Sequence, residues 1–94
     1  MKLLSVTPSK KPEKKLDAKF ETDTGRTKVV SFGQRGADDF TKTQDIEQRA
    51  RYLKRHSRNE DWNKKDSPGA LSRWILWGES TSLMQNIANY KRKV

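Results

Sequence analysis

The sequence predicts an α+β fold: a basic N-terminal arm, then a β-hairpin, then about three helices that pack on the hairpin. Apolar and polar residues alternate with a period of two over residues 14–33, on either side of a Thr-Asp-Thr-Gly turn, which is typical of a half-buried hairpin. Beyond it, apolar residues recur with helical spacing behind residues that commonly cap helices. The 94 residues suffice for one domain. We place that domain at residues 14–94 and the arm at residues 1–13.

The arm is expected to be extended and mobile. The segment from Thr7 to Lys15 contains two prolines and four lysines but no apolar residue, so it cannot bury enough surface to offset the entropy of ordering it. Such segments often serve only solubility. The alternative is contact with an anionic partner, and Lys10, Lys11 and Lys14 are the candidate residues.

The hairpin has one face suited to a core. Leu16, Ala18 and Phe20 alternate with charged residues in the first strand, and Val30 and Phe32 share a face of the second. A lone hairpin is marginally stable in water, so we expect the helices to cover this face.

The first helix is expected from Asp45 to Arg58, with Asp45 as its cap and Gln48 as the reciprocal capping partner. Ile46, Ala50 and Leu53 recur at i, i+4 and i+7 and are expected to face the core. A second row lies about a third of a turn away and contains only cations: Arg51, Lys54, Arg55 and Arg58.

Two further helices are expected. Ser67 is a good cap for the second and Pro68 suits its first position, and Gly78 ends it. The third is expected to begin after Ser80 or Thr81. The predicted core draws on the hairpin and all three helices: Phe20, Phe32, Leu53, Leu71, Trp74, Ile75, Leu76, Leu83 and Ile87.

Several classes of chemistry are disfavoured by composition. The chain has no cysteine and one histidine, which excludes disulfides and thiol catalysis and disfavours a metal site or a conventional catalytic triad. No Lys-Ser or Lys-Thr follows the Gly33–Gly36 loop, so it is not a P-loop. No apolar stretch approaches the ~20 residues of a membrane span. We therefore expect a non-enzymatic protein without metal, cofactor or transmembrane segment.

The most prominent remaining feature of the sequence is its excess of positive charge. The chain carries 21 Lys and Arg against 12 Asp and Glu, a formal charge of +9. Lys91 and Arg92 form a second basic tip at the other end of the chain. The basic helix row could contact phosphates or an acidic protein surface. Trp62 is expected to pack under its loop, with base stacking as the alternative.

Part of the sequence resembles a known family. The resemblance rests on Gly36–Thr41, Arg49–His56 and Glu60–Asn63, and most specifically on the run Gly69–Leu83, followed by a tail at Ile87–Lys93. These residues resemble the small basic proteins of unassigned function found in large double-stranded DNA viruses of eukaryotes. The resemblance implies a hairpin followed by helices and a viral context, and it supplies no catalytic residues.

The expected function is that of a minor structural protein of the virion. Its basic arm and basic helix would bridge neighbouring proteins by binding acidic surfaces, and the expected partners are other capsid proteins. The alternative is a packaging protein that binds DNA or RNA through the basic helix.

Overall fold

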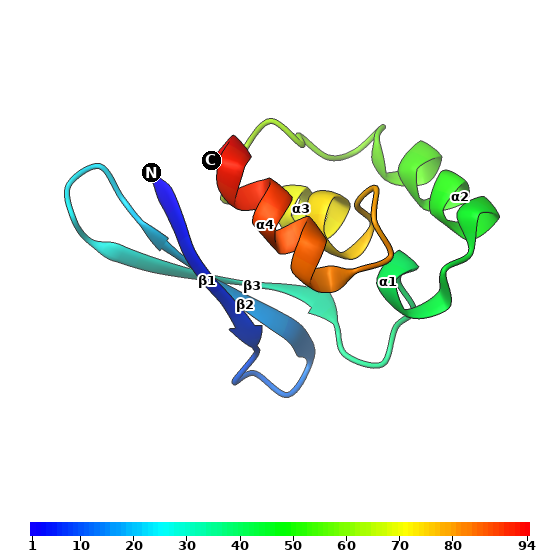
Figure 1. Ribbon diagram of the computed structural model, residues 1–94, viewed down its shortest axis with the longest axis horizontal. Coiled ribbons are helices and arrows are strands. Elements are labelled where there is room, and N and C mark those ends of the chain that lie inside the picture. Colours follow the sequence, from blue (N-terminus) through cyan, green and yellow to red (C-terminus); the bar gives the residue numbers. More distant parts are fainter.

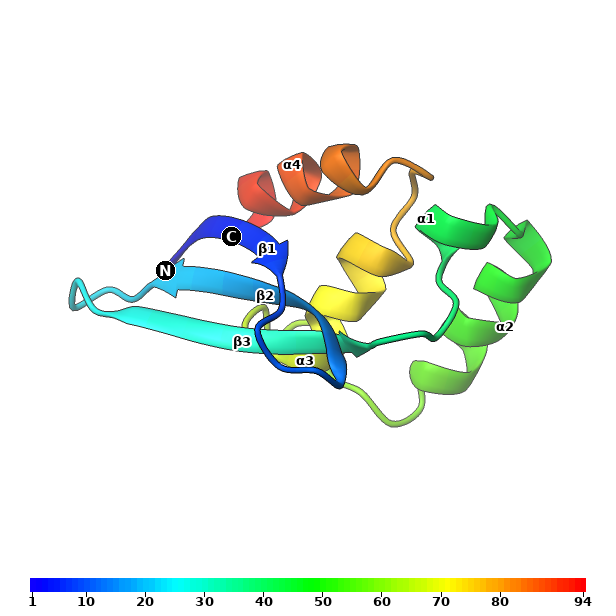
Figure 2. The same ribbon diagram turned by 90° about the horizontal axis from the view of Figure 1, so that it is seen from below.

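The computed structural model, which describes residues 1–94, has a three-stranded antiparallel sheet with helices against one of its faces (Figures 1 and 2). The strands are β1 (Lys2–Pro8), β2 (Lys14–Glu21) and β3 (Thr27–Gln34), in the order β1-β2-β3. The helical segments are α1 (Phe40–Thr43), α2 (Ile46–His56), α3 (Pro68–Leu71), a π-helical turn η1 (Ser72–Leu76) and α4 (Leu83–Lys93). The predicted α+β class is confirmed.

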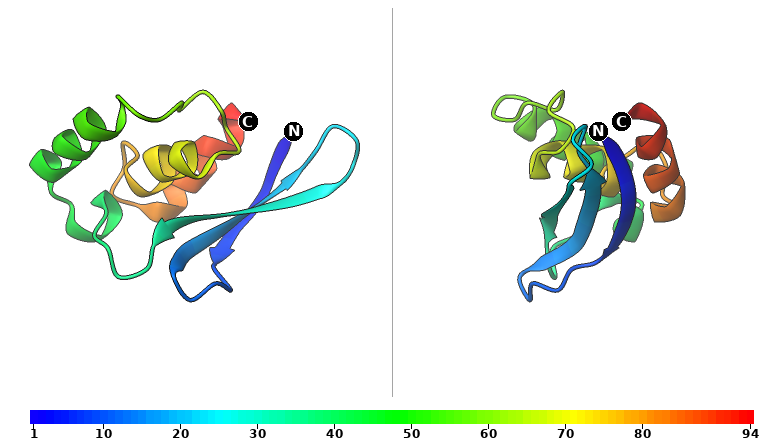
Figure 3. Two further views of the ribbon diagram at one scale, coloured as in Figure 1. Left: turned by 180° about the vertical axis from the view of Figure 1, so that it is seen from behind. Right: turned by 90° about the vertical axis from the view of Figure 1, so that its left-hand side faces the viewer.

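The helices are divided between the sheet and one end of the molecule. α3 and η1 pack against β3, and α4 packs against β1. α1 and α2 lie beyond the end of the sheet (Figures 1 and 2). The two chain termini lie close to each other, at a distance from α2 (Figure 3). This arrangement leaves α2 with a large solvent-facing side.

The predicted hairpin is confirmed as β2 and β3. Leu16 pairs with Phe32 and Ala18 pairs with Val30, so the apolar residues of both strands share the face that the helices cover. Gly25 adopts a φ of +83° in the connecting turn, a conformation that favours glycine because it has no Cβ.

The expectation of a mobile arm is wrong for Lys2–Pro8, which forms the third strand of the sheet. Leu3 pairs with Phe20 and is 7% exposed, and Val6 pairs with Ala18. A β-bulge between Leu3 and Ser5 places both apolar residues on the inner face. The bulge breaks the two-residue period, which is why alternation did not reveal this strand in the sequence.

The Lys- and Pro-rich segment is the turn between β1 and β2. Asp17 holds it, because its carboxylate accepts hydrogen bonds from Ser9 Oγ at 2.7 Å and from the backbone N–H of Lys10 at 3.3 Å. Lys10 and Lys11 are exposed on this turn. They belong to an ordered loop and not to a free arm.

The predicted first helix exists as α2, but its buried face was assigned wrongly. Asp45 caps it by accepting the N–H of Gln48 at 3.1 Å. Ile46 is nevertheless 73% exposed, whereas Tyr52 is 8% exposed and faces the core. The Gln48 side chain accepts from Thr43 Oγ1 at 2.7 Å instead of completing the capping box.

The remaining helices begin largely as predicted. The Ser67 side chain accepts the N–H of Ala70, and Pro68 opens α3. The helix then widens into the π-helical turn η1 before Gly78. α4 is capped by Ser82, and not by Ser80 or Thr81, because the Ser82 side chain accepts the N–H of Gln85.

The core only partly matches the predicted set. Phe20, Phe32, Leu71, Ile75 and Leu76 are buried. Four other predicted members are only partly buried and pack against that core: Leu53, Trp74, Leu83 and Ile87. Buried residues absent from the prediction are Leu3, Ala18, Phe40, Tyr52, Ala70, Trp77 and Tyr90.

Candidate docking site

The predicted basic row lies on the solvent-facing side of α2 and on the turn that follows it, because the helix ends at His56 and not at the predicted Arg58. Arg51, Lys54, Arg55 and Arg58 are all exposed, and together they are the only residues that line a shallow hollow of about 260 Å³. None of the four forms an ion pair within the chain. The row therefore presents uncompensated positive charge to an approaching partner.

The opposite side of α2 is fixed to the domain by aromatic and arginine contacts. The Tyr52 ring stacks on Trp77 with centroids 4.2 Å apart and planes at 6°, and on His56 at 4.1 Å. Arg49 Nε donates to the backbone carbonyls of Trp77 and Gly78 at 3.2 and 3.0 Å. These contacts set the rotation of α2, so the basic row points outward.

A larger hollow of about 400 Å³ adjoins this row, between the hairpin and α2. Lys14 and Arg55 both line it. Arg55 also lines a third hollow, with Arg51 and Asp38. Arg55 thus lies where three concave surfaces meet, and the structure brings Lys14 to the same area as the α2 row.

An ion pair and a histidine–carboxylate hydrogen bond flank the larger hollow. Lys15 Nζ lies 2.6 Å from Asp39, whose carboxylate also caps α1. His56 Nδ1 lies 2.9 Å from Glu60, and the other oxygen of Glu60 accepts from Trp62 Nε1 at 2.9 Å. Trp62 is accordingly half-buried in its loop.

The lining of the larger hollow includes three side chains that could take part in acid–base or nucleophilic chemistry: Tyr52, His56 and Ser72. Burial raises the pKa of the Tyr52 phenol far above its usual range, with a further contribution from the charge of Glu60. Ser72 lines the same hollow as His56, but no hydrogen bond joins the two side chains. No group of three or more His, Cys, Asp or Glu residues is placed to hold a metal ion.

The other predicted cations lie elsewhere. Lys10 and Lys11 are on the β1–β2 turn, and Lys91 and Arg92 are on the last turn of α4. The end of α4 and α2 are on different sides of the molecule (Figure 1). The arm lysines, the helix row and the C-terminal tip, named separately in the sequence, thus lie on three different elements of the fold.

Sequence reasoning missed the residues that orient the row. Arg49, Tyr52 and His56 form the inner side of α2, and Trp77 is the surface they contact. The spacing of Tyr52 and His56, four residues apart on one side of a helix, was the available signal.

These observations define a small α+β protein with a cation-lined hollow at one helix. The chain belongs to a family of unknown function, DUF5754, whose model matches residues 4–56. The matched stretch is more than half of the 94 residues and ends at the last residue of α2, so it includes Arg51, Lys54 and Arg55. The run Gly69–Leu83 lies outside it. No curated protein and no solved structure matches the chain, and none of its helices has the length and apolar character required to span a bilayer.

Proposed function

We propose that this protein is a non-enzymatic minor structural protein of a large DNA virus that docks on acidic surfaces of neighbouring capsid proteins through α2. The observation that carries the docking proposal is the hollow lined only by Arg51, Lys54, Arg55 and Arg58, none of which has an internal counter-ion. The viral setting and the virion location rest on the sequence resemblance.

The surroundings of the row favour a protein partner over a nucleic acid. Glu47 is exposed on the same side of α2 as the row, and Asp38 lines a hollow together with Arg51 and Arg55. A continuous array of phosphates would meet repulsion at both carboxylates, whereas a protein surface can place cations opposite them. The mixed pattern is therefore better matched by a partner with its own mixed charges.

A bridging role needs more than one contact surface. The β1–β2 turn carries Lys10 and Lys11, and the last turn of α4 carries Lys91 and Arg92. Because the β1–β2 turn, the end of α4 and α2 lie in different parts of the fold (Figure 1), one copy of the chain can contact more than one neighbour.

The test reverses charge at the centre of the row. Arg51→Glu combined with Arg55→Glu should leave the circular dichroism spectrum unchanged, because both side chains are exposed. Losing two attractive contacts and adding repulsion should cost about 2 kcal/mol, or about 30-fold in affinity. The readout is the amount of tagged protein in purified particles and its crosslinks to shell proteins.

The matched control is Lys19→Glu combined with Arg26→Glu, which makes the same change in net charge at exposed positions on β2 and its turn. Normal incorporation of this control with loss of the α2 variant supports the proposal. Equal incorporation of both variants refutes it.

Nucleic-acid packaging is the second candidate, and the absence of any carboxylate from the lining of the α2 hollow favours it. If all four cations contact phosphates, the affinity for duplex DNA should fall about 150-fold between 50 and 200 mM salt, from a slope of about −0.9 per contact. The double charge reversal should then roughly halve that slope. Binding to DNA with this salt dependence would replace the protein-docking proposal.

A further inference from the structure

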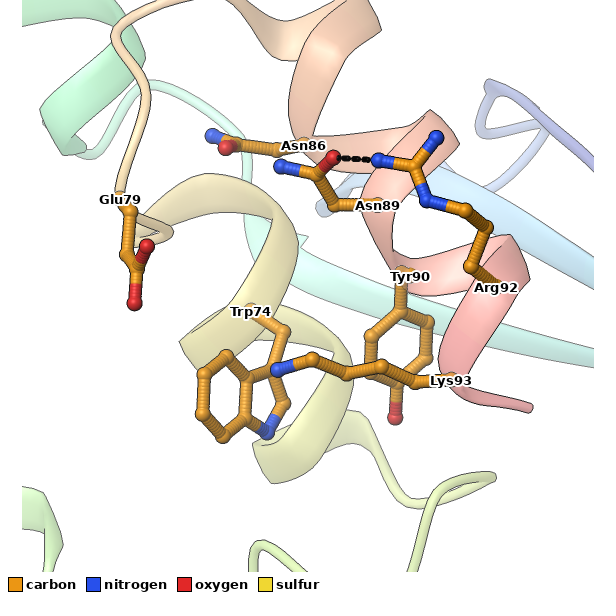
Figure 4. Close-up of a pocket in the computed structure, with 7 residues that line it drawn as sticks. All are labelled: Trp74, Glu79, Asn86, Asn89, Tyr90, Arg92 and Lys93. Carbon is orange, nitrogen blue, oxygen red and sulfur yellow. Dashed lines mark hydrogen bonds between the residues drawn. The ribbon is translucent and has the colours of Figure 1, made fainter.

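A further hollow, separate from the three near Arg55, lies between η1 and α4, away from the α2 row. Its volume is about 320 Å³, and its lining includes Trp74, Glu79, Asn89, Arg92 and Lys93 (Figure 4). The Lys93 side chain extends along this hollow and places its ammonium group over the Trp74 ring (Figure 4).

Two cations share the Trp74 indole. Lys93 Nζ lies 3.2 Å from the ring centroid and Arg73 Cζ lies 4.0 Å from it. Arg73 also lies 5.2 Å from the Trp62 ring. Trp62, Arg73, Trp74 and Lys93 are thus linked by successive cation–π contacts, each of which favours the positively charged form of its Arg or Lys.

These cations lack the carboxylate partners that such groups normally have. Neither Arg73 nor Lys93 forms an ion pair. Arg73 donates from Nη1 to the Trp77 carbonyl at 3.2 Å, but its buried Nε has no hydrogen-bond partner. An unpaired buried donor on a charged group is costly.

The pKa shifts of Arg73 and Lys93 are consistent with the lack of a carboxylate partner for either group. Burial, and then the charge of Arg49, lowers the pKa of Arg73. Burial, and then the charge of Arg73, lowers the pKa of Lys93. Glu79 acts in the opposite direction on both groups without neutralising either. An added negative charge beside Lys93 would therefore stabilise both cations.

One further hydrogen-bond donor borders the hollow, across from the Lys93 ammonium (Figure 4). The Asn89 carbonyl oxygen accepts from Gln85 Nε2 at 2.9 Å and from Arg92, and its amide nitrogen has no internal partner. Figure 4 shows the Asn89 amide and the Lys93 ammonium bordering the same space. An oxyanion in this space could accept hydrogen bonds from both.

We propose that this hollow is a separate binding site for an acidic peptide segment, with a side-chain carboxylate held by Lys93 Nζ and the Asn89 amide nitrogen. A carboxylate fits better than a phosphate, because Glu79 borders the hollow and would repel a group carrying nearly two negative charges more strongly. The site does not depend on the α2 row, so the two proposals can fail separately.

The test uses NMR titration of the full chain carrying Arg51→Glu and Arg55→Glu, which removes competition from α2. The probes are a hexaglutamate peptide blocked at both ends, its hexaglutamine counterpart and inorganic phosphate. Hexaglutamate should shift the Trp74 indole N–H and the Lys93 Nζ resonances. It should also raise the pKa of Lys93, because the anion binds the ammonium form.

Lys93→Gln removes the charge and keeps a side chain of similar length. It should weaken hexaglutamate binding about tenfold, the loss expected for one charge-assisted hydrogen bond. Lys91→Gln is the matched control on an exposed position of the same helical turn, and it should change affinity less than about twofold.

Three outcomes would overturn the proposal. One is unchanged affinity in Lys93→Gln, and another is an equal Trp74 response to hexaglutamine. The third is a Trp74 response to phosphate with none to hexaglutamate, which would assign the site to phosphorylated ligands. A Trp74 response that persists in the α2 variant, together with normal particle incorporation of that variant, would refute the proposed function and support this site.

Discussion

Asn86 is the buried polar residue that joins α4 to the rest of the helical layer, and its replacement by alanine is a quantitative test of the structure. The side chain is 2% exposed. Its Nδ2 donates to the carbonyls of Ile75 at 3.0 Å and Ser80 at 2.8 Å, and its Oδ1 accepts the N–H of Ser80 at 3.1 Å. Asn86→Ala therefore removes three hydrogen bonds and leaves three backbone groups without these partners.

The expected loss can be worked from these bonds. At about 1 kcal/mol net for each bond, the free energy of unfolding should fall by about 3 kcal/mol. For a domain of this size, that corresponds to a decrease in Tm of roughly 12–24 °C. Because small domains have only about 5–15 kcal/mol in total, the variant should be severely destabilised in urea unfolding followed by circular dichroism.

Asn89→Ala is the matched control. Asn89 is on the same helix, but it bonds only to the exposed side chains of Gln85 and Arg92, so its removal should cost less than about 0.5 kcal/mol. If Asn86→Ala were no more destabilising than this control, the assignment of Asn86 as the link between α4 and η1 would be wrong.

Three further predictions concern other parts of the fold. Deletion of Met1–Pro8 should abolish cooperative thermal unfolding, because it removes the buried Leu3 and leaves one edge of the central strand β2 unpaired; a truncated chain that melts like the full one would show that β1 is dispensable. Gly78→Ala should destabilise the domain by about 3 kcal/mol in urea unfolding, because an added Cβ would overlap the Trp74 carbonyl oxygen and lie 2.7 Å from Asn86 Cγ; a wild-type midpoint would contradict this packing. The hydrogen bond from Lys28, at 2.7 Å, holds the pKa of Asp66 below its usual value. Stability from this pair is therefore present above about pH 3.9 and is lost as the pH falls through the lowered pKa. Asp66→Asn should lessen the acid destabilisation measured between about pH 5 and pH 2, and an unchanged pH profile would show that the pair does not act in solution.

Features that depend on neighbouring residues could be predicted well. The β2–β3 hairpin follows from alternation around a turn, and the caps at Asp45 and Ser67 follow from side chains that bond backbone groups three residues away. The basic row is of the same kind, because residues spaced at i, i+3, i+4 and i+7 share one side of any helix.

Features that depend on contacts between segments distant in the sequence could not be predicted. Helical periodicity favoured Ile46 as a core residue, but α2 buries Tyr52, because Tyr52 stacks on Trp77 from a different helix. The cation–π cluster around Trp74 is another example. It joins Trp62, Arg73 and Lys93 from the connecting loop, η1 and α4, and no spacing in the sequence relates these residues.

Local patterns were enough to predict the hairpin, the starts of α2 and α3 and the presence of a cationic helix side, because each of these is set by interactions within a few residues along the chain. The tertiary structure alone decided that Lys2–Pro8 completes the sheet, which side of α2 is buried, and that the cations form separate surfaces. These outcomes depend on which apolar side chains from distant segments are buried against one another, and this is set by the packing of the whole domain.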